Sequence, residues 1–239
     1  MFVLSRPAMA AIVAATTIAA SASSSVVVGW TMPTAFPTGT GNVPTGTSYL
    51  PPGPNGAGVA DQGTNTAGSQ IRSVHAAAAA TYTSPAGNGS PYSFSSNNWN
   101  TGDFYEISFS TTGITDSMTL SWDQARSSTG PAAFKVAISV NGGAFTDLFN
   151  YTVLQSGGGG APGTWSSTTY NALYSNTLNL GTTASDASSV VIRFVNREAV
   201  ASAASGSNRI DNVFVNIPAP GAVALLGVAG LAASRRRRA

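Results

Sequence analysis

Apolar and polar residues alternate with a period of two through much of this 239-residue chain, and this pattern constrains its fold most. Successive side chains of a β-strand point to opposite faces, so the pattern predicts half-buried strands. Three segments carry it most clearly: Tyr105, Ile107 and Phe109; Met118, Leu120 and Trp122; and Phe134, Val136, Ile138 and Val140.

Turn residues and further apolar runs extend the prediction. Asn141-Gly142-Gly143 follows an alternating segment and predicts a hairpin, because Asn and Gly tolerate the positive φ of a tight turn. More strands are expected at 26–30, 170–180, 190–194 and 210–215, whereas 76–80 fits either one helical turn or a strand. With no long helical periodicity, the chain is predicted to be an all-β protein, an antiparallel β-sandwich of jelly-roll type.

Composition and charge exclude several functions. The chain has no Cys, which excludes disulfides, Cys-ligated metals and a thiol nucleophile, and its one histidine excludes sites built from several His ligands. Of eleven basic residues, Arg6 and Arg235–Arg238 lie near the termini, which leaves six against nine acids and a net charge of −3 in the body. Nucleic-acid binding needs clustered Lys and Arg, so we exclude it, and no cofactor is expected.

The N-terminal segment has the features of an export signal. Arg6 precedes a run of Ala, Ile, Val and Thr, and the run ends in the small-residue pattern Ala20, Ser21, Ala22. Residues 1–22 are therefore predicted to form a signal-peptide helix that is cleaved near Ala22.

The C-terminal segment, residues 218–239, combines a proline motif, a short apolar run from Gly221 to Ala233 and four arginines. Thirteen apolar residues make a short transmembrane helix, and the arginines favour a topology with the body outside. This order resembles the PEP-CTERM sorting signal of Gram-negative bacteria, which implies recognition by an exosortase-like membrane protease. Ala219 replaces the central Glu of that family, which leaves open a divergent protease or an anchor that is not cut. The predicted sorting residues are Pro218, Ala219, Pro220, Gly221, Arg235, Arg236, Arg237 and Arg238.

Two segments lie between these signals. In residues 31–70, 27 of 40 positions are Pro, Gly, Thr, Ser or Asn, so 23–70 is predicted as a first strand followed by a linker or by loops on the domain. Residues 71–217 are predicted as the sandwich domain. This span, with NNWNTGDFYEISFS and RIDNVFV, resembles sandwich modules of secreted PEP-CTERM proteins and, more loosely, carbohydrate-binding jelly rolls.

Few residues are suited to catalysis. Ser-His-Asp chemistry would need His75, but no G-x-S-x-G motif occurs, and His75 is predicted to be an ordinary strand or loop residue. Asp103, Glu106, Asp123 and Asp211 could supply a carboxylate pair for glycoside hydrolysis. Asp103 and Glu106 lie three positions apart, so a regular strand directs them to opposite faces.

The candidate ligand-binding residues are Trp99, Asp103, Tyr105, Asp123 and Arg126. Trp99 lies among asparagines just before a predicted strand, where its side chain can face solvent; the alternative is that Trp99 belongs to the core. Arg126 could pair with Asp123 beside the turn at 127–131. This segment serves either as a structural turn or as a polar rim for sugar hydroxyls, with Trp99 or Tyr105 as a stacking platform.

A metal site is left open. Asp211 and Asn212 offer oxygen ligands for Ca²⁺, but no EF-hand loop is present.

These features predict an exported, non-enzymatic β-sandwich held at the cell surface or in the extracellular matrix of a Gram-negative-type bacterium. Its role is structural or glycan-binding; the alternative is a secreted carbohydrate-active enzyme with paired carboxylates. The expected partners are an exosortase-like protease, an extracellular polysaccharide and, before processing, the inner membrane.

Overall fold

The computed structural model describes residues 24–36, 44–157, 161–198 and 204–219. The predicted signal peptide and the predicted C-terminal helix with its arginines lie outside these residues. Ser24–Pro218 forms one body, and within the described ranges its only helix is the short 3₁₀ helix η1 (Ala172–Tyr174). No helix in the part of the chain described is long and apolar enough to span a membrane.

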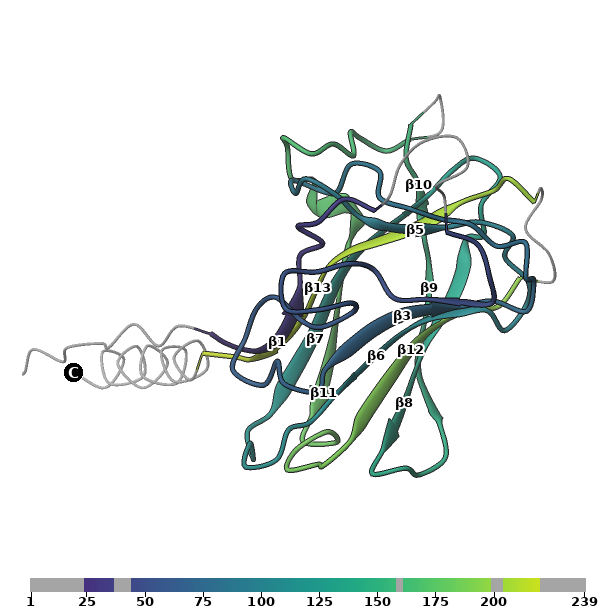
Figure 1. The fold of residues 1–239 in the computed structure, drawn as a ribbon. Coiled ribbons are helices and arrows are strands. Elements are labelled where there is room, and N and C mark those ends of the chain that lie inside the picture. Colours follow the sequence, from purple (N-terminus) through teal and green to yellow (C-terminus); the bar gives the residue numbers. More distant parts are fainter. Residues whose placement is uncertain (1–23, 37–43, 158–160, 199–203, 220–239) are drawn as a thin grey trace, which may run out of the picture. The chain divides into compact units, whose positions relative to one another are not determined.

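The described strands form two sheets (Figure 1). All pairings are antiparallel except that of β10 with β7. The seven-stranded sheet contains β1 (Ser25–Trp30), β4 (Tyr82–Thr83), β5 (Phe94–Ser96), β7 (Met118–Arg126), β10 (Leu154–Gln155), β11 (Ser175–Gly181) and β13 (Asn208–Ile217). The six-stranded sheet contains β2 (Ser48–Tyr49), β3 (Gln70–Val74), β6 (Phe104–Phe109), β8 (Ala133–Val140), β9 (Thr146–Thr152) and β12 (Val190–Asn196).

The core lies between the two sheets, where aromatic rings from both meet. Trp122 of β7 lies 5.1 Å from Phe194 of β12 and 5.2 Å from Tyr151 of β9, measured between ring centroids. The alternating residues predicted to face inward on β6 and β7 are buried, as are Phe134, Val136 and Ile138 of β8. The prediction of an all-β sandwich from the period-two pattern is thus confirmed.

The predicted hairpin joins β8 to β9. Asn141 and Gly142 both have positive φ, 50° and 74°, and the Gly143 N–H donates to the Val140 carbonyl over 3.0 Å. Positive φ at both central positions matches the right-handed twist of the flanking strands, which is why this pair of residues closes the turn.

The described part of the Pro/Gly/Thr-rich segment packs on the sandwich. β1 pairs with β13, and Gly29 of β1 exchanges backbone hydrogen bonds with Gln62. The Trp30 indole donates to the Gly58 carbonyl over 2.8 Å, and Met32 is buried. Residues 44–69 therefore belong to the domain, as loops and the short strand β2. The 76–80 segment, left open between helix and strand, forms a turn in which the Ala80 N–H donates to Ala77.

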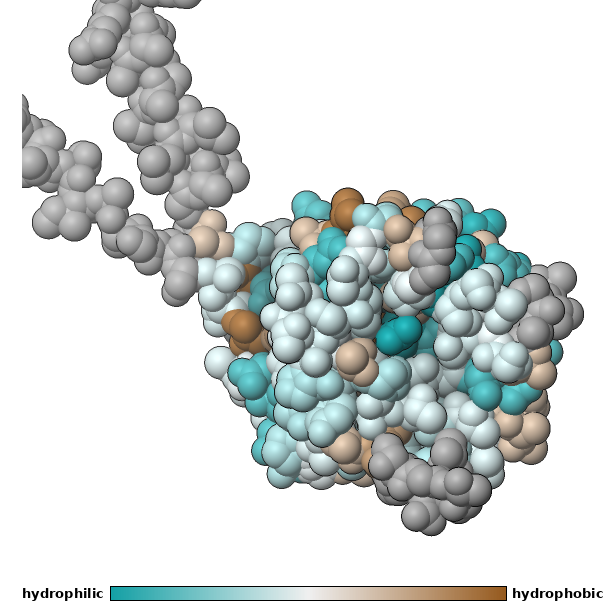
Figure 2. Space-filling model, turned by 90° about the horizontal axis from the view of Figure 1, so that it is seen from above, coloured by the Kyte–Doolittle hydropathy of each residue, from teal (hydrophilic) through white to brown (hydrophobic). Residues whose placement is uncertain are grey.

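One face of the described body is polar without being strongly charged. In the face shown in Figure 2, residues of intermediate or hydrophilic character dominate and apolar residues are scattered. This distribution agrees with a chain in which 8% of residues are charged. Scattered apolar residues of this kind are normal on soluble proteins and do not themselves indicate an interface.

Candidate functional site

Trp99 lies in the core, so its interpretation as a solvent-facing side chain is wrong and the core alternative is confirmed. Its side chain is 1% exposed, its indole donates to the Ser96 carbonyl over 2.9 Å, and its ring lies 5.5 Å from that of Phe134. The neighbouring asparagines are the reason: Asn98 donates to the Ala79 carbonyl, and Asn97 accepts from the Thr81 N–H. These bonds hold the loop against the 76–81 turn, and the indole points inward.

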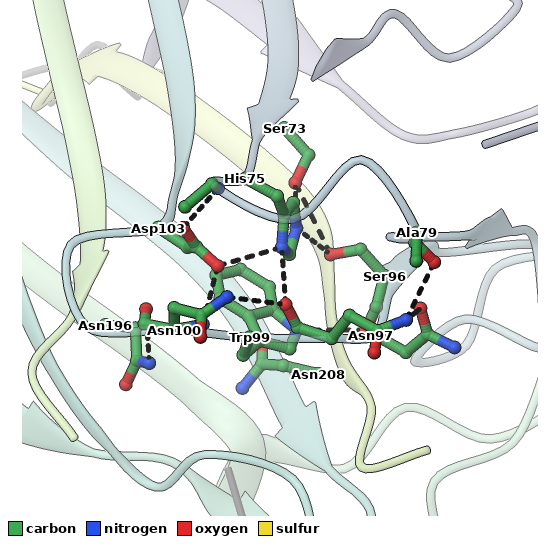
Figure 3. Close-up of polar contacts among 12 residues, drawn as sticks. Ser73, His75, Ala79, Ser96, Asn97, Trp99, Asn100, Asp103, Asn196 and Asn208 are labelled. Atoms are coloured by element: carbon green, nitrogen blue, oxygen red, sulfur yellow. Dashed lines mark hydrogen bonds and ion pairs between the residues drawn. The ribbon is translucent and has the colours of Figure 1, made fainter. Parts of the chain in front are cut away.

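Asp103 belongs to the same interior, where it meets His75 (Figure 3). His75 Nδ1 lies 3.1 Å from Asp103 Oδ2, and His75 Nε2 lies 3.0 Å from the hydroxyls of both Ser73 and Ser96. A serine, a histidine and an aspartate in this order are the parts of a nucleophilic triad. Here all four side chains are buried, so neither hydroxyl meets solvent. The arrangement joins β3, β5 and the start of β6.

Asp103 also anchors two loops. It accepts hydrogen bonds from the backbone N–H groups of Ala76, over 2.8 Å, and Asn100, over 2.6 Å. Burial raises the pKa of Asp103, but the bonds from His75, Asn100 and Ala76 outweigh burial and hold the pKa below its ordinary value of 3.8. The prediction of His75 as an ordinary strand or loop residue missed this network. The sequence signal that could have indicated it is the spacing of Ser73 and His75, which lie two positions apart and therefore on the same face of the strand.

Tyr105 is buried as well and cannot serve as a stacking platform. Its hydroxyl donates to the Asn208 carbonyl over 2.6 Å and accepts from Ser96 over 3.2 Å. Burial raises its pKa well above the ordinary value of 10.0. The period-two pattern itself placed Tyr105 on the apolar face of β6, which is why the ring is inside.

Arg126 does not pair with Asp123, contrary to expectation. Residues three apart on a strand point to opposite faces, and Arg126 instead donates to carbonyls of Val153, Ser127 and Ser128 over 3.0–3.2 Å. Arg126 therefore supports the turn that follows β7, which is the structural interpretation of that segment.

Asp123 reaches an open depression on the seven-stranded sheet. Its Oδ2 accepts hydrogen bonds from the side-chain amides of Asn88, over 3.1 Å, and Asn212, over 2.8 Å, and its Oδ1 accepts from the Ser175 hydroxyl. The depression has a volume of about 350 Å³. Besides these four residues, its lining includes Ser121, Tyr170, Asn176, Thr177 and Phe214.

The rim of the depression carries an exposed aromatic ring. Tyr170 is 57% exposed, and its hydroxyl lies 2.6 Å from that of Ser175. Asn88 holds this segment from the other side, because its Oδ1 accepts from the Asn171 N–H over 2.9 Å. The site thus combines amides, hydroxyls, one carboxylate and a flat aromatic face.

Asp211 does not line the depression but bonds to the loop that supplies Asn88 to it. It pairs with Asp123 across β13 and β7 and is fully buried; its Oδ2 accepts from the Asn88 N–H over 2.8 Å and from the Ser90 hydroxyl over 2.6 Å. Its Oδ1 has no hydrogen-bond partner among the described residues. Burial, with a further contribution from nearby Asp123, raises the pKa of Asp211 from 3.8 to about 7.

The two calcium ligands considered from sequence differ: Asp211 keeps Oδ1 without a partner among the described residues, whereas Asn212 is bonded to other groups. Asn212 points its amide nitrogen at Asp123 and at the Asn88 carbonyl. No group of three or more His, Cys, Asp or Glu residues suited to a metal ion occurs among the residues described.

Of the four acids considered for a catalytic pair, Asp103 and Glu106 have separate partners. Asp103 bonds to His75, and Glu106 bonds to Arg72 and Arg193. Asp123 and Asp211 are the two that lie opposite each other in a strand pairing.

No protein-family model and no curated protein sequence matches this chain. Among solved structures, its fold is similar to the CBM22-1 and GH10 modules of Clostridium thermocellum endo-1,4-β-D-xylanase 10B in complex with xylohexaose, with a TM-score of 0.43 and 12% identity over 82% of this chain. The match covers 29% of the xylanase chain.

Two smaller structures are similar over most of their own length. The K1 cleaved adhesin domain of Lys-gingipain from Porphyromonas gingivalis W83 has a TM-score of 0.39 and 11% identity, covering 79% of this chain and 96% of that domain. TmCBM61 in complex with β-1,4-galactotriose has a TM-score of 0.36 and 8% identity, covering 62% and 88%. At these values the similarity carries no information on ligand or activity.

Proposed function

We propose that this protein is an exported, jelly-roll-like β-sandwich that binds a glycan in the depression beside Asp123. The observation that carries the proposal is Tyr170, an exposed ring on the rim of a hollow lined by amides and hydroxyls. Ligand sites in proteins typically combine flat aromatic surface with a few fixed polar groups.

The polar groups of the depression favour a neutral sugar. Both oxygens of Asp123 already accept hydrogen bonds from the protein, so this carboxylate orients Asn88, Asn212 and Ser175 and keeps little free acceptor capacity. Ser121, Asn176 and Thr177 add uncharged donors and acceptors to the lining. No Lys or Arg lines this depression.

A pair of matched substitutions tests the proposal. Tyr170 and Leu173 lie in the same segment and are equally exposed, at 57%, but only Tyr170 lines the depression. On a panel of neutral polysaccharides, Tyr170→Ala should weaken retention about tenfold or more, whereas Leu173→Ala should leave it unchanged. Equal retention of both variants and the parent on every bound polysaccharide would exclude this depression as the site.

The proposal for location rests on the terminal segments. The sequence resemblance of these segments to an export signal and a PEP-CTERM tail supports a location at the cell surface or in the matrix. In this proposal the protein reaches that location through an exosortase-like protease and a membrane-anchored precursor. Sorting to the surface brings a glycan-binding module to its polysaccharide, because the polysaccharide lies outside the cell.

A second candidate is glycoside hydrolysis by Asp123 and Asp211. Two aspartates on directly paired strand positions, one with its pKa raised to about 7, are the pattern of an acid and base pair. Against it, Asp211 is fully buried and bonded to the 84–92 loop. Release of reducing sugar by the wild type that is lost in Asp123→Asn would establish the hydrolase; retention without release supports binding alone.

A further inference from the structure

The outer face of the six-stranded sheet carries a row of charged residues that the proposed glycan site does not use. The strand pairings place Arg72 of β3, Glu106 of β6 and Arg193 of β12 side by side. Their chain neighbours Ile71, Ile107 and Ile192 are fully buried, so these three charged side chains point away from the core. The row is on the opposite sheet from the depression beside Asp123.

Glu106 is shared by the two arginines. Its Oε1 lies 2.6 Å from Arg72 Nη2, and its Oε2 lies 2.7 Å from Arg193 Nε. The Glu106 side chain is 7% exposed, but those of Arg72 and Arg193 are 38% and 31% exposed. One carboxylate neutralises one guanidinium, so the row keeps a net charge of +1 that is open to solvent.

Arg193 is held in a fixed orientation. Its guanidinium carbon lies 4.2 Å from the ring centroid of Phe104 and 4.0 Å from that of Phe145, so it has two cation–π contacts. Its Nε is bonded to Glu106, and no described residue bonds its two terminal nitrogens. These nitrogens form a preorganised fork, and Phe145 beside them is 39% exposed.

The charge of the whole body makes this row unusual. Between the terminal segments six basic residues stand against nine acids, yet Arg72, Arg193 and Lys135 of β8 all lie on this sheet. Lys135 is paired with Asp147 over 2.8 Å and contributes no surplus charge. The body is acidic overall, but the guanidinium groups of Arg72 and Arg193 lie close together and share one carboxylate. This position therefore favours binding of an anion.

We propose that Arg72 and Arg193 bind an acidic polysaccharide through its carboxylate or sulfate groups. The planar guanidinium matches two oxygens of such a group, and the bond is strengthened by charge. The exposed ring of Phe145 supplies an apolar surface for the adjoining sugar ring. This site goes beyond the proposed function, because it lies on the other sheet and takes a different class of glycan.

Titration calorimetry of the full chain in detergent micelles tests the site, with polygalacturonate and dextran sulfate as acidic probes and dextran as the neutral one. Arg193→Gln should lower the affinity for the acidic polymers at least about tenfold. Lys135→Gln removes the same charge from the same sheet and should lower it less than about threefold, because Lys135 is already paired. Arg72→Gln, at the more exposed partner, should repeat the loss if Arg193→Gln does not fold.

Glu106→Gln should change the affinity for acidic polymers in the opposite direction. Removing the shared carboxylate raises the free charge of the row, so the affinity for acidic polymers should increase. A merely structural ion-pair cluster predicts lower stability and no gain in affinity. Unchanged affinity in the folded arginine variants, or equal affinity for dextran, would overturn the proposal.

Two further measurements distinguish the sources of the anion and the two sites. Tighter binding to phosphatidylglycerol vesicles than to either acidic polymer would overturn the polysaccharide assignment in favour of a membrane surface. Tyr170→Ala should leave acidic-polymer binding unchanged; a parallel loss would overturn the separation of the two sites.

Discussion

Asp211 lies directly opposite Asp123 in the antiparallel pairing of β13 with β7, and both carboxyl groups are buried. The two differ in their partners. Asp123 accepts from three side chains, whereas Asp211 holds the 84–92 loop with one oxygen and leaves the other without a partner among the described residues. One carboxyl group therefore orients the lining of the depression, and the other fixes the loop that supplies Asn88.

This relationship predicts how stability depends on pH. The pKa of Asp211 is about 7 in the folded chain against 3.8 ordinarily, so the unfolded chain releases this proton first as pH rises. The free energy of unfolding should therefore fall between about pH 4 and pH 7, by at most about 4 kcal/mol from this group, and level off above. Asp103 acts in the other direction and only in more acid solution, since its pKa is lowered.

Urea denaturation of the wild type and Asp211→Asn at about pH 3.5 and about pH 8, on either side of that window, measures the effect. Asparagine does not ionise, so the variant should lose the fall in stability that Asp211 causes. Parallel stability curves for the two proteins would show that Asp211 does not keep its proton in the folded chain.

The strands were predictable because their signal is local. The alternation in β6, β7 and β8 and the Asn141-Gly142 turn fix strand, face and hairpin from neighbouring residues alone. The depression was not predictable, because its groups come from positions far apart in the sequence. Asn88 and Asn212 are separated by 124 residues, yet Asn212 donates to the Asn88 carbonyl and both side chains donate to Asp123. Of the five candidate ligand-binding residues, only Asp123 lines it.

The error at Trp99 has a physical cause of the same kind. Three neighbouring asparagines made the segment look like an exposed loop, but asparagine amides can bond to backbone groups as well as to water. Asn97 and Asn98 bond to the 79–81 backbone, and the loop becomes a cover for the core. Local composition indicates polarity, and it does not indicate what the polar groups bond to.

Trp99→Ala should therefore be a stability variant. The substitution leaves a cavity beside His75 and Phe134 and removes the indole bond to Ser96, and it should lower the free energy of unfolding by about 3–5 kcal/mol. The fraction that remains folded should bind neutral glycans as the parent does. A variant that has parental stability but no longer binds glycan would show that Trp99 contributes to the ligand site.

The tail carries a separate prediction. Deleting residues 218–239 should move the protein from the envelope or matrix into the medium or periplasm, because the proposed sorting signal is removed. Replacing Arg235–Arg238 with serine should impair retention or topology, since basic residues resist translocation. Cell fractionation with intact-mass analysis of each fraction measures both. An unchanged distribution of the deletion variant would contradict sorting by this segment.

Gly87 lies beside the buried carboxyl group of Asp211, in the loop that carries Asn88. Its substitution is the last prediction. A Cβ at this position would lie 2.4 Å from the Tyr92 carbonyl oxygen and 2.5 Å from Asp211 Oδ2, closer than atoms in proteins approach. The backbone carbonyl cannot move without shifting the 84–92 loop, so Gly87→Ala should lower the free energy of unfolding by about 1–3 kcal/mol. Because the same loop carries Asn88, neutral-glycan retention should fall with it, while binding of acidic polymers on the opposite sheet persists. Urea denaturation and both binding assays on one preparation measure these effects. Full glycan retention in a destabilised variant would show that the loop does not position the site.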